Sequence, residues 1–543
     1  MFIPNSHQLA GFDAFKNTTN HLLFSAVAGS GKSTTLLELL KFIPAGKRVI
    51  FLAFNKSIQL ELQGKVSSSI EVKTLHGKGS EICFANFPLL KTAKKKIEPQ
   101  KTILWLNHWL AKPENQYHIE NLGTEKESTI FYYKMNISKI YDYMRLNLVS
   151  KQEEIEELVD RYNIDVMADE IEVAVKVYDY FKNTDNHFTI DFADMLWLPY
   201  IRHKTFPTYD YVFVDECQDL STVQIEMVFK LAGPKGRMIF CGDKKQQLYA
   251  FASADVMAWE KICNIPNITI LPLGYNYRCG KDIVGLAKTL VPEIEPGLTH
   301  DGVIVQNGNI ENIQPGDFVL CRNNYPLILL YVYLIKKKVP VVIKGAEIGQ
   351  DLIYLVEKVG KKNLKSSAKI VMGGMWKILK DKIEKLRQKG HPAPEKNSGI
   401  VALKEKMKIV KILIEFLNPI SVEDLIKLIR SIFSEDITNK VVLSTIHKAK
   451  GLENDRVYFY LPKLIPSPFA QKTWEKEAER NLQYVAITRA KNELIFVHKD
   501  LDGNEVDVNG GVLTFDEHEM LAFEKEVEFV EKITNGSVSG GFV

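Results

Sequence analysis

Short apolar runs alternate with stretches of helical spacing over much of this chain. Residues 22–26 (LLFSA) and 211–214 (YVFV) are largely apolar, which predicts strands buried on both faces. Residues 317–345 (DFVLCRNNYPLILLYVYLIKKKVPVVIKG) show the pattern of a strand, a helix and a second strand. An alternation of strands and helices predicts a parallel sheet covered by helices on both faces, so the expected fold class is α/β.

Two long segments interrupt this alternation with helical periodicity alone. Residues 91–185 combine mixed charge with many aromatic residues, and residues 351–437 contain patterns such as MWKILKDKIEKLRQKG and VEDLIKLIRSIF. A chain of 543 residues is also too long for one hydrophobic core. We therefore predict two α/β domains, each with one helical insertion, followed by a tail. The expected bounds are 1–90 with 186–272 for the first domain, 91–185 for its insertion, 273–350 with 438–510 for the second domain, 351–437 for its insertion, and 511–543 for the tail.

The first predicted strand runs directly into a glycine-rich turn, AVAGSGKS at residues 26–33, and then into a helix. Gly29, Ser30 and Gly31 permit a loop whose backbone N–H groups point at phosphate, and the helix adds its positive N-terminal end. Lys32 can reach the terminal phosphates of a nucleotide, and the Ser33 hydroxyl can hold Mg²⁺. The turn departs from the usual pattern only in having alanine at its first glycine position. It predicts a nucleoside triphosphate site.

The strand at 211–214 ends in three acids, in the stretch VFVDECQD at residues 212–219. Buried strands do not normally end in several carboxylates unless something binds there. A bound nucleotide needs a second magnesium ligand, which Asp215 can supply, and a base for the attacking water, which Glu216 can supply. These residues indicate an NTP hydrolase. Kinases and switch GTPases carry the same loop, so the class stays open at this point.

The overall composition is ordinary for a soluble globular protein, with a formal net charge of +3. This bias is too small to prove a nucleic-acid partner, but lysine clusters at 91–96 and 336–338 permit one. The six cysteines form no CxxC pair, so neither a zinc site nor a disulfide framework is indicated. No apolar run is long enough to span a membrane, and the N-terminus lacks the pattern of a secretion signal. We therefore expect a cytoplasmic or nucleoid-associated protein.

Further stretches complete a series whose order is informative. AVAGSGKS, VDECQD, GDKKQQLYAF, LGYNYRC, LSTIHKAKGLE and ERNLQYVAITRAK together resemble the motifs of superfamily 1 DNA helicases of the UvrD/Rep/PcrA type. FLAFNKSI and VKTLHGKG also resemble the F-box DNA helicase branch, although no F-box is recognised. The resemblance covers roughly residues 4–495. It implies two RecA-like motor domains of the P-loop NTPase fold, with ATP and Mg²⁺ as cofactors.

The same resemblance assigns roles around the nucleotide. Arg278 and Arg489 match cations that reach the γ-phosphate from the second motor domain, in the manner of an arginine finger. Gln246 matches the γ-phosphate sensor. The other matches are Tyr277 on adenine, Glu453 on the ribose, Asn5 and Gln8 on the adenine edge, Gln218 in coupling, and Thr34 where relatives often have an adenine-stacking arginine.

A second group of residues resembles the contacts to single-stranded DNA. Phosphate contacts and base stacking on aromatic rings grip a strand without reading its sequence. The matching residues are Phe54, Asn55, Lys56, Thr74, His76, Tyr249, Phe251 and His447. After Phe251 the chain reads Ala252-Ser253-Ala254 where relatives usually have Arg-Gly-Ala, so a cation that helps couple the DNA and ATP sites is absent.

The leading hypothesis is an ATP-dependent helicase that moves 3′ to 5′ on single-stranded DNA and unwinds duplexes in replication, repair or recombination. Its polarity comes from resemblance alone. A second hypothesis is a translocase that strips proteins from DNA, which the small 351–437 insertion and Ala252 keep open. Further alternatives are a nucleotide-dependent switch that binds DNA without moving along it, and a motor that moves along RNA. Expected partners are single-stranded DNA, its junctions with duplex DNA, and replication or recombination proteins. A monomer could suffice.

Overall fold

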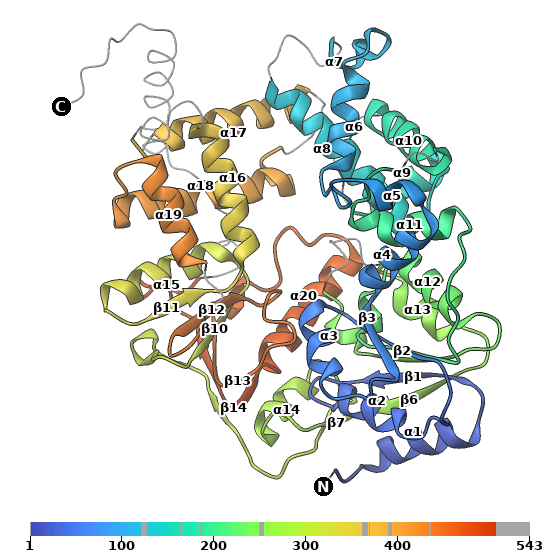
Figure 1. Cartoon of the computed structure of the whole chain (residues 1–543). Helices are drawn as coiled ribbons and strands as arrows, with labels where there is room; N and C mark the ends of the chain where they lie inside the picture. The colour runs from blue at the N-terminus through green and yellow to red at the C-terminus, as the bar shows by residue number, and fades with distance from the viewer. Residues whose placement is uncertain are drawn as a thin grey trace, which may run out of the picture. The chain divides into compact units, whose positions relative to one another are not determined.

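The computed structural model describes residues 2–120, 127–162, 164, 166, 168–184, 187–248, 255–360, 367–368, 370–388, 394–433 and 436–506. The chain divides into two compact units, Met1–Tyr275 and Asn276–Val543, and each is described by itself (Figure 1). In the described part of the chain, no helix is both long and apolar enough to cross a membrane.

The first unit is built on a parallel sheet of six strands in the order β3-β2-β4-β5-β1-β6. The strands are β1 (His21–Ala26), β2 (Val49–Ala53), β3 (Ile70–Thr74), β4 (Tyr211–Val214), β5 (Arg237–Gly242) and β6 (Ile268–Leu273). The predicted strands at 22–26 and 211–214 are therefore confirmed as β1 and β4, and β5 lies between them. Because all pairs are parallel, the carboxyl ends of β1, β4 and β5 lie at one edge of the sheet.

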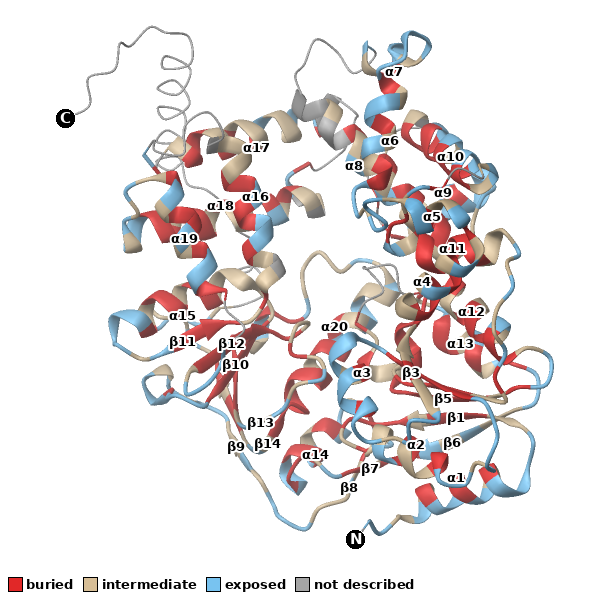
Figure 2. Ribbon diagram, in the orientation of Figure 1, coloured by how far each residue is buried: buried red, intermediate tan, exposed pale blue. Residues whose placement is uncertain are grey.

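Alternate residues of these strands enter two different hydrophobic cores, as the two-residue period of a strand requires. Leu22 and Phe24 of β1 pack against helices α1, α2 and α3, whereas Leu23 packs on the opposite face against α4, α11 and α12. Figure 2 shows the strands as mostly buried between these helices. The helices are α1 (Ser6–Asn17), α2 (Lys32–Leu40), α3 (Lys56–Gln63), α4 (Leu75–Asn86), α11 (Phe192–Ile201), α12 (Thr222–Ala232) and α13 (Ala258–Cys263).

The predicted insertion after α4 is mainly helical in its described residues. It contains α5 (Pro88–Thr92), α6 (Lys101–Leu110), α7 (Tyr117–Glu120), α8 (Glu127–Asn147), α9 (Gln152–Arg161) and α10 (Ala168–Asn183). Its aromatic side chains form the interior: Tyr141 and Tyr178 are fully buried and pack edge-on, and Tyr141 also meets Trp197 of α11. Tyr141 and Tyr178 are therefore core residues, and the contact of Tyr141 with Trp197 helps to fix the insertion to the sheet domain.

The second unit has its own parallel sheet, in the order β11-β12-β10-β13-β14-β9. The strands are β9 (Val303–Val305), β10 (Phe318–Cys321), β11 (Val341–Ile343), β12 (Val441–Thr445), β13 (Asn454–Tyr460) and β14 (Ala490–Val497). The strand–helix–strand pattern at 317–345 is confirmed as β10, α15 (Asn324–Lys336) and β11. Helices α14 (Lys281–Lys288) and α20 (Thr473–Ile487) belong to the same unit, and β7 (Tyr275–Asn276) pairs with β8 (Glu295–Pro296) in a separate small sheet.

In the described residues between β11 and β12, four α-helices interrupt the second sheet domain. They are α16 (Ala346–Gly360), α17 (Ile370–Gln388), α18 (Ser398–Leu417) and α19 (Val422–Ile432). One hydrophobic core runs from Val319 and Leu443 of the sheet to Leu352, Met407 and Ile429 of these helices. The predicted α/β class, with two parallel sheets that each accept a mainly helical insertion, is therefore confirmed.

A close contact between two helices in the first unit predicts a sensitive glycine. A Cβ atom on Gly79 of α4 would lie 2.0 Å from the carbonyl oxygen of Met195 in α11, so Gly79→Ala must push the two helices apart. We expect a loss of about 1–3 kcal/mol in the free energy of unfolding, visible as a lowered melting temperature. Gly285→Ala in α14 is the matched control, because nothing lies within 4 Å of its added atom. Equal melting temperatures for the two variants would contradict this packing.

Candidate functional site

The turn between β1 and α2 has the backbone shape of a phosphate loop. Gly29 and Gly31 adopt positive φ values of 64° and 77°, which residues with a side chain rarely adopt. Gly31 is the N-cap of α2, and Lys32 is the first residue of that helix. A loop of this kind, continued by a helix N-terminus, presents backbone N–H groups to an anion.

Lys32 lies among carboxylates that come from the ends of two neighbouring strands. Its Nζ lies 3.5 Å from Oε1 of Glu216, a residue that follows β4. The negative charge of Asp243, which follows β5, also acts on Lys32. Burial by itself lowers the pKa of Lys32, but the negative charges of Glu216, Asp243 and Asp215 outweigh it, and the pKa is raised. The ammonium group therefore stays charged and available to a phosphate.

Ser33 and Asp215 bring two oxygens together beside this lysine. The Ser33 hydroxyl donates to Asp215 Oδ2 over 3.1 Å. Burial, helped by the neighbouring charge of Glu216, raises the pKa of Asp215 to about 6, so its carboxylate gains from a nearby cation. No cluster of three or more His, Cys, Asp or Glu side chains suited to a metal occurs among the described residues. A hydroxyl and one carboxylate fit Mg²⁺ that is bound mainly through nucleotide phosphates and water.

Glu216 is held in an unusual backbone conformation, with φ 51° and ψ 43°. This left-handed region costs free energy for a residue with a side chain, and such strain is concentrated at functional sites. The Gln218 amide donates to Glu216 Oε2 over 2.5 Å and accepts from the backbone N–H of Asp243 over 3.0 Å. Gln246 in turn donates to Asp243 Oδ2 over 2.7 Å. The two strand ends are thus joined by a continuous hydrogen-bonded chain.

Gly242 makes this chain of contacts sterically feasible. A Cβ atom at this position would lie 2.4 Å from Gln218 Oε1. Asp243 and Gly242 stand in the stretch GDKKQ, in which sequence reasoning had assigned a role only to Gln246. The contact between Gln218 and Gly242 joins two strand ends, so the spacing within either stretch did not reveal it.

Gln8 lies against the end of the glycine-rich turn. Its amide nitrogen donates to the Thr35 hydroxyl over 3.0 Å, and that hydroxyl donates to the Gly31 carbonyl over 2.9 Å. Its amide oxygen accepts from the backbone N–H of Asn5 in a capping box that starts α1. Both ends of the amide are engaged within the protein. The predicted contact of Asn5 and Gln8 with adenine stays a prediction, as does the role of the exposed Thr34.

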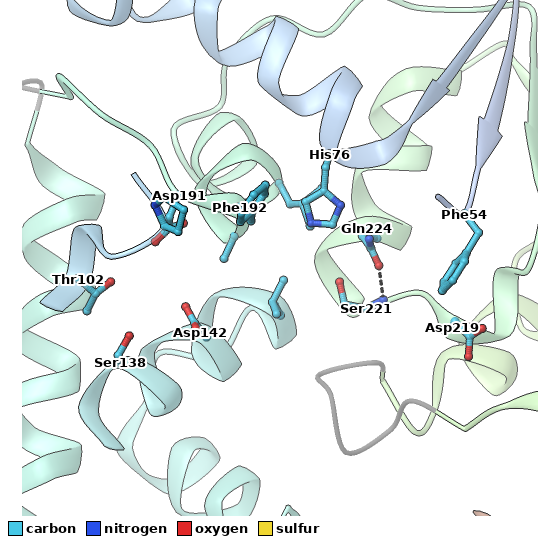
Figure 3. A pocket seen from close by; sticks show the side chains of 14 residues that line it. Phe54, His76, Thr102, Ser138, Asp142, Asp191, Phe192, Asp219, Ser221 and Gln224 are labelled. Carbon is cyan, nitrogen blue, oxygen red and sulfur yellow. Dashed lines mark hydrogen bonds between the residues drawn. The ribbon is translucent and has the colours of Figure 1, made fainter. Parts of the chain in front are cut away.

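A separate cavity of about 440 Å³ lies between the sheet domain and its helical insertion (Figure 3). Phe54 and His76, both predicted DNA contacts, line it together with Phe192. Thr102 of α6 and Ser138 of α8 contribute from the insertion. Aromatic rings beside polar groups are suited to unstacked bases, because stacking tolerates any base.

Two other predicted DNA contacts have a local structural role. The Asn55 side chain caps α3 by accepting from the backbone N–H of Ile58, and Thr74 caps α4 by accepting from that of Gly77. Lys56 is exposed at the start of α3, where its Nζ lies 3.2 Å from Gln59 Oε1. The predicted contacts of Asn55, Lys56 and Thr74 with DNA stay predictions. Tyr249 and Phe251, with Ala252-Ser253-Ala254, lie outside the described residues.

Phe192 is a candidate that sequence reasoning missed. Its side chain is 55% exposed although it begins a helix rich in apolar residues, and its ring centroid is 6.4 Å from that of His76. The stretch IDFADMLWL had been used only to place the return of the chain to the sheet domain. Its signal was an aromatic residue directly after Asp191, the N-cap of α11, ahead of the buried residues 194–199.

In the second unit, Arg278 and Glu453 form an ion pair. Arg278 Nε lies 2.5 Å from Glu453 Oε2, and Lys491 lies 3.0 Å from the other carboxylate oxygen. The pKa of Glu453 is lowered, because these two cations outweigh the effect of its partial burial. Tyr277 is 40% exposed and its ring lies against Gly297. The structure thus brings the predicted ribose ligand together with one predicted phosphate cation.

Arg489 is almost completely buried, at 1% exposure. Its guanidinium donates to the Val485 carbonyl over 3.0 Å and to the Leu452 carbonyl over 2.9 Å. These carbonyls hold the planar group in one orientation without neutralising its charge. An arginine that must meet phosphate needs this combination of fixed geometry and retained charge.

His447 and Arg322 lie after two neighbouring strands, because Cys321 at the end of β10 pairs with Thr445 at the end of β12. Burial and the positive charge of Arg322 lower the pKa of His447 to about 3. Arg322 is also held by Glu479, with Nη2 2.7 Å from Oε1. Sequence reasoning had not singled out Arg322, although it stands directly after β10 in the stretch LCRNNY.

The fold and the first site together define a class. A parallel sheet whose first strand leads through glycines at positive φ to a half-buried lysine, with acids at the ends of neighbouring strands, is that of a P-loop nucleoside triphosphatase. Residues 8–264 match the family model of the UvrD/REP helicase N-terminal domain, and residues 440–497 match that of the UvrD-like helicase C-terminal domain. The two matches together cover more than half of the chain. The chain belongs to the UvrD-type helicases of superfamily 1.

Several curated proteins are similar to this chain. The F-box DNA helicase protein 1 of Schizosaccharomyces pombe is 23% identical over 535 residues, which cover 91% of this chain and 58% of that protein. The ATP-dependent DNA helicase PcrA of Bacillus subtilis is 24% identical over 299 residues, 51% of this chain and 38% of that protein. DNA helicase II of Escherichia coli is 29% identical over 126 residues, 21% of this chain and 18% of that protein. The chain thus spans little more than half of the first relative and less of the others.

The half-buried position of His447 beside Arg322 predicts a dependence of stability on pH. The unfolded chain takes up a proton near pH 6.5, whereas the folded histidine resists protonation until about pH 3. The stabilisation is therefore present above pH 6.5 and is lost as the pH falls. We expect up to about 2 kcal/mol less stability at pH 5 than at pH 7.5 from this residue. His447→Gln should lose less stability than the wild type over this interval in denaturant titrations, and the exposed His300→Gln should behave like the wild type.

Proposed function

We propose that this chain is an ATP-dependent DNA helicase that translocates 3′ to 5′ on single-stranded DNA and unwinds duplex DNA. The observation that carries the proposal is the group of Lys32, Ser33, Asp215 and Glu216, half-buried or buried at the sheet edge, in a chain of the UvrD helicase family. The names of its relatives, among them ATP-dependent DNA helicase PcrA, support the activity, and the direction of movement rests on family resemblance.

In this proposal, Ser33 and Asp215 hold Mg²⁺, which would neutralise charge on the β- and γ-phosphates of ATP. Lys32 binds the same phosphates from the end of the glycine-rich turn. Glu216 accepts the proton of the attacking water, and its strained backbone with the Gln218 contact keeps it oriented. Gln246 senses the γ-phosphate.

The second unit supplies the remaining groups in the proposed cycle. Arg278 and Arg489 stabilise the charge that develops on the transferred phosphoryl group, Tyr277 stacks on adenine and Glu453 binds the ribose. The ion pair of Arg278 with Glu453 holds these two side chains next to each other. Hydrolysis would then drive motion of one unit against the other, which is what a motor requires.

Single-stranded DNA would lie along the cavity with Phe54, His76 and Phe192 in the first unit. In the second unit, the proposed DNA contact is His447. We propose the following division of the chain. Residues 1–90 with 186–272 would form the first motor domain, and residues 273–350 with 438–510 would form the second. Residues 91–185 and 351–437 would be their insertions. Each element needed for ATP turnover is carried by this one chain, so we propose that a monomer suffices.

The role of Glu216 as general base can be tested with a single substitution. Glu216→Gln keeps an oxygen for the Gln218 amide but cannot accept a proton from water, so hydrolysis should fall about 10²- to 10⁴-fold. Binding of a fluorescent ATP analogue should stay within about threefold of the wild type, because the phosphate contacts are kept. Glu61→Gln on the exposed face of α3 is the matched control. Undiminished turnover in Glu216→Gln would refute the role given to Glu216.

Strand displacement separates the helicase from its alternative. ATP-driven unwinding is measured on one duplex with a 3′ single-stranded tail and one with a 5′ tail. We expect unwinding of the 3′-tailed duplex alone. Failure on both duplexes, with ATP hydrolysis still stimulated by single strands, would instead favour a translocase that strips proteins from DNA. Preference for the 5′-tailed duplex would reverse the proposed polarity.

A further inference from the structure

A buried network of charges joins the helical insertion to the start of α11. Arg145 of α8 is fully buried, and its Nη1 lies 2.8 Å from Asp191 Oδ1 and 2.6 Å from Asp194 Oδ1. Its Nη2 lies 2.9 Å from the second oxygen of Asp191 and also pairs with Asp142. Lys101 of α6 lies 2.5 Å from Asp194 Oδ2. Three helices, distant in sequence, therefore meet at two carboxylates.

The same two carboxylates form the N-terminal cap of α11. Asp191 Oδ1 accepts from the backbone N–H of Asp194 over 2.8 Å, and Asp194 Oδ2 accepts from that of Asp191 over 3.2 Å. The preceding residue, Ile190, exchanges backbone hydrogen bonds with the entry of the insertion, accepting from Glu98 and donating to Lys96. The entry to α11 is thus fixed by the insertion through both backbone and side chains.

Phe192 follows directly, as the first residue of α11. Arg145 holds Asp191 through both oxygens, so a shift of this cap would move Phe192 with it. Figure 3 shows Asp191 and Phe192 side by side on the wall that also bears His76. An exposed aromatic ring on so rigid a support is suited to stacking, because little conformational freedom is lost when a base binds.

We propose that Arg145 is a positioning residue for strand binding, which holds Phe192 in the cavity wall by clamping Asp191. This inference rests on the proposed function, because it takes the cavity as a site for single-stranded DNA. In this proposal, the helical insertion contributes to the binding of single-stranded DNA. The planar guanidinium reaches both oxygens of Asp191 and one of Asp194 at once, which a lysine ammonium cannot reproduce.

A double-mutant cycle on the full chain tests the link. Affinity for a fluorescent oligo(dT) is measured for Arg145→Lys, Phe192→Ala and the double variant. Phe192→Ala should weaken binding about tenfold. Arg145→Lys should weaken it by a similar or smaller factor, and the double variant should bind no more weakly than Phe192→Ala. In ATPase assays, Arg145→Lys should raise the oligo(dT) concentration for half-maximal stimulation and leave the maximal rate within about twofold.

The control is Asp169→Asn, which alters a carboxylate 2.7 Å from His118 Nδ1 in the same insertion but does not touch α11. It should bind oligo(dT) like the wild type. If Arg145→Lys does not fold, Asp191→Asn replaces it, because asparagine still caps the helix but loses the charge that pairs with Arg145. Asp191→Asn should then show the same non-additivity with Phe192→Ala.

The outcomes separate this inference from the proposed function. Wild-type affinity in Phe192→Ala would remove the cavity as strand site and contradict the DNA contacts of the proposed function. Weakened binding in Phe192→Ala with fully additive losses in the double variant would show that Arg145 acts independently of Phe192. That result would overturn the positioning role and leave the proposed function standing.

Discussion

The half-buried cation of Lys32 among the carboxylates of Asp215, Glu216 and Asp243 is the interaction on which the nucleotide site depends. A lone buried charge would cost several kcal/mol, so these groups are tolerable only together. They meet because β4, β5 and β1 are neighbours in a parallel sheet and end at the same edge. The order of the strands therefore brings the residues of the site together, and the helices that pack on both faces of the sheet stabilise that order.

The segment after β4 extends this constraint from the nucleotide toward the proposed strand site. Asp215 and Glu216 face Lys32 and Ser33, and Asp219, at the end of the same short turn, lines the cavity that contains Phe54. A change in charge near Lys32 would therefore act on the turn that begins with Asp215 and ends with Asp219, which lines the cavity. Within the first unit, this short path would couple the proposed ATP hydrolysis to the proposed binding of a strand.

Local sequence predicted those parts that local physics determines. The apolar strand, the glycines and Lys32 form one contiguous stretch, so the phosphate loop could be predicted from spacing alone. Phe192, Arg145 and the Gln218–Gly242 contact could not, because each depends on segments that meet only after folding. Gln8 shows a further limit: an amide suited to adenine is equally suited to a capping box, and its partners in the structure are Asn5 and Thr35.

The central claim is that the nucleotide site drives a motor on single-stranded DNA. The most direct measurement is the steady-state rate of ATP hydrolysis by the full chain during titration with oligo(dT), with a blunt duplex of equal length as comparison. The account predicts that the single strand raises the rate about tenfold or more, while the blunt duplex has little effect. Hydrolysis at the same rate with and without the single strand would contradict it, because the site would then turn over ATP without a track.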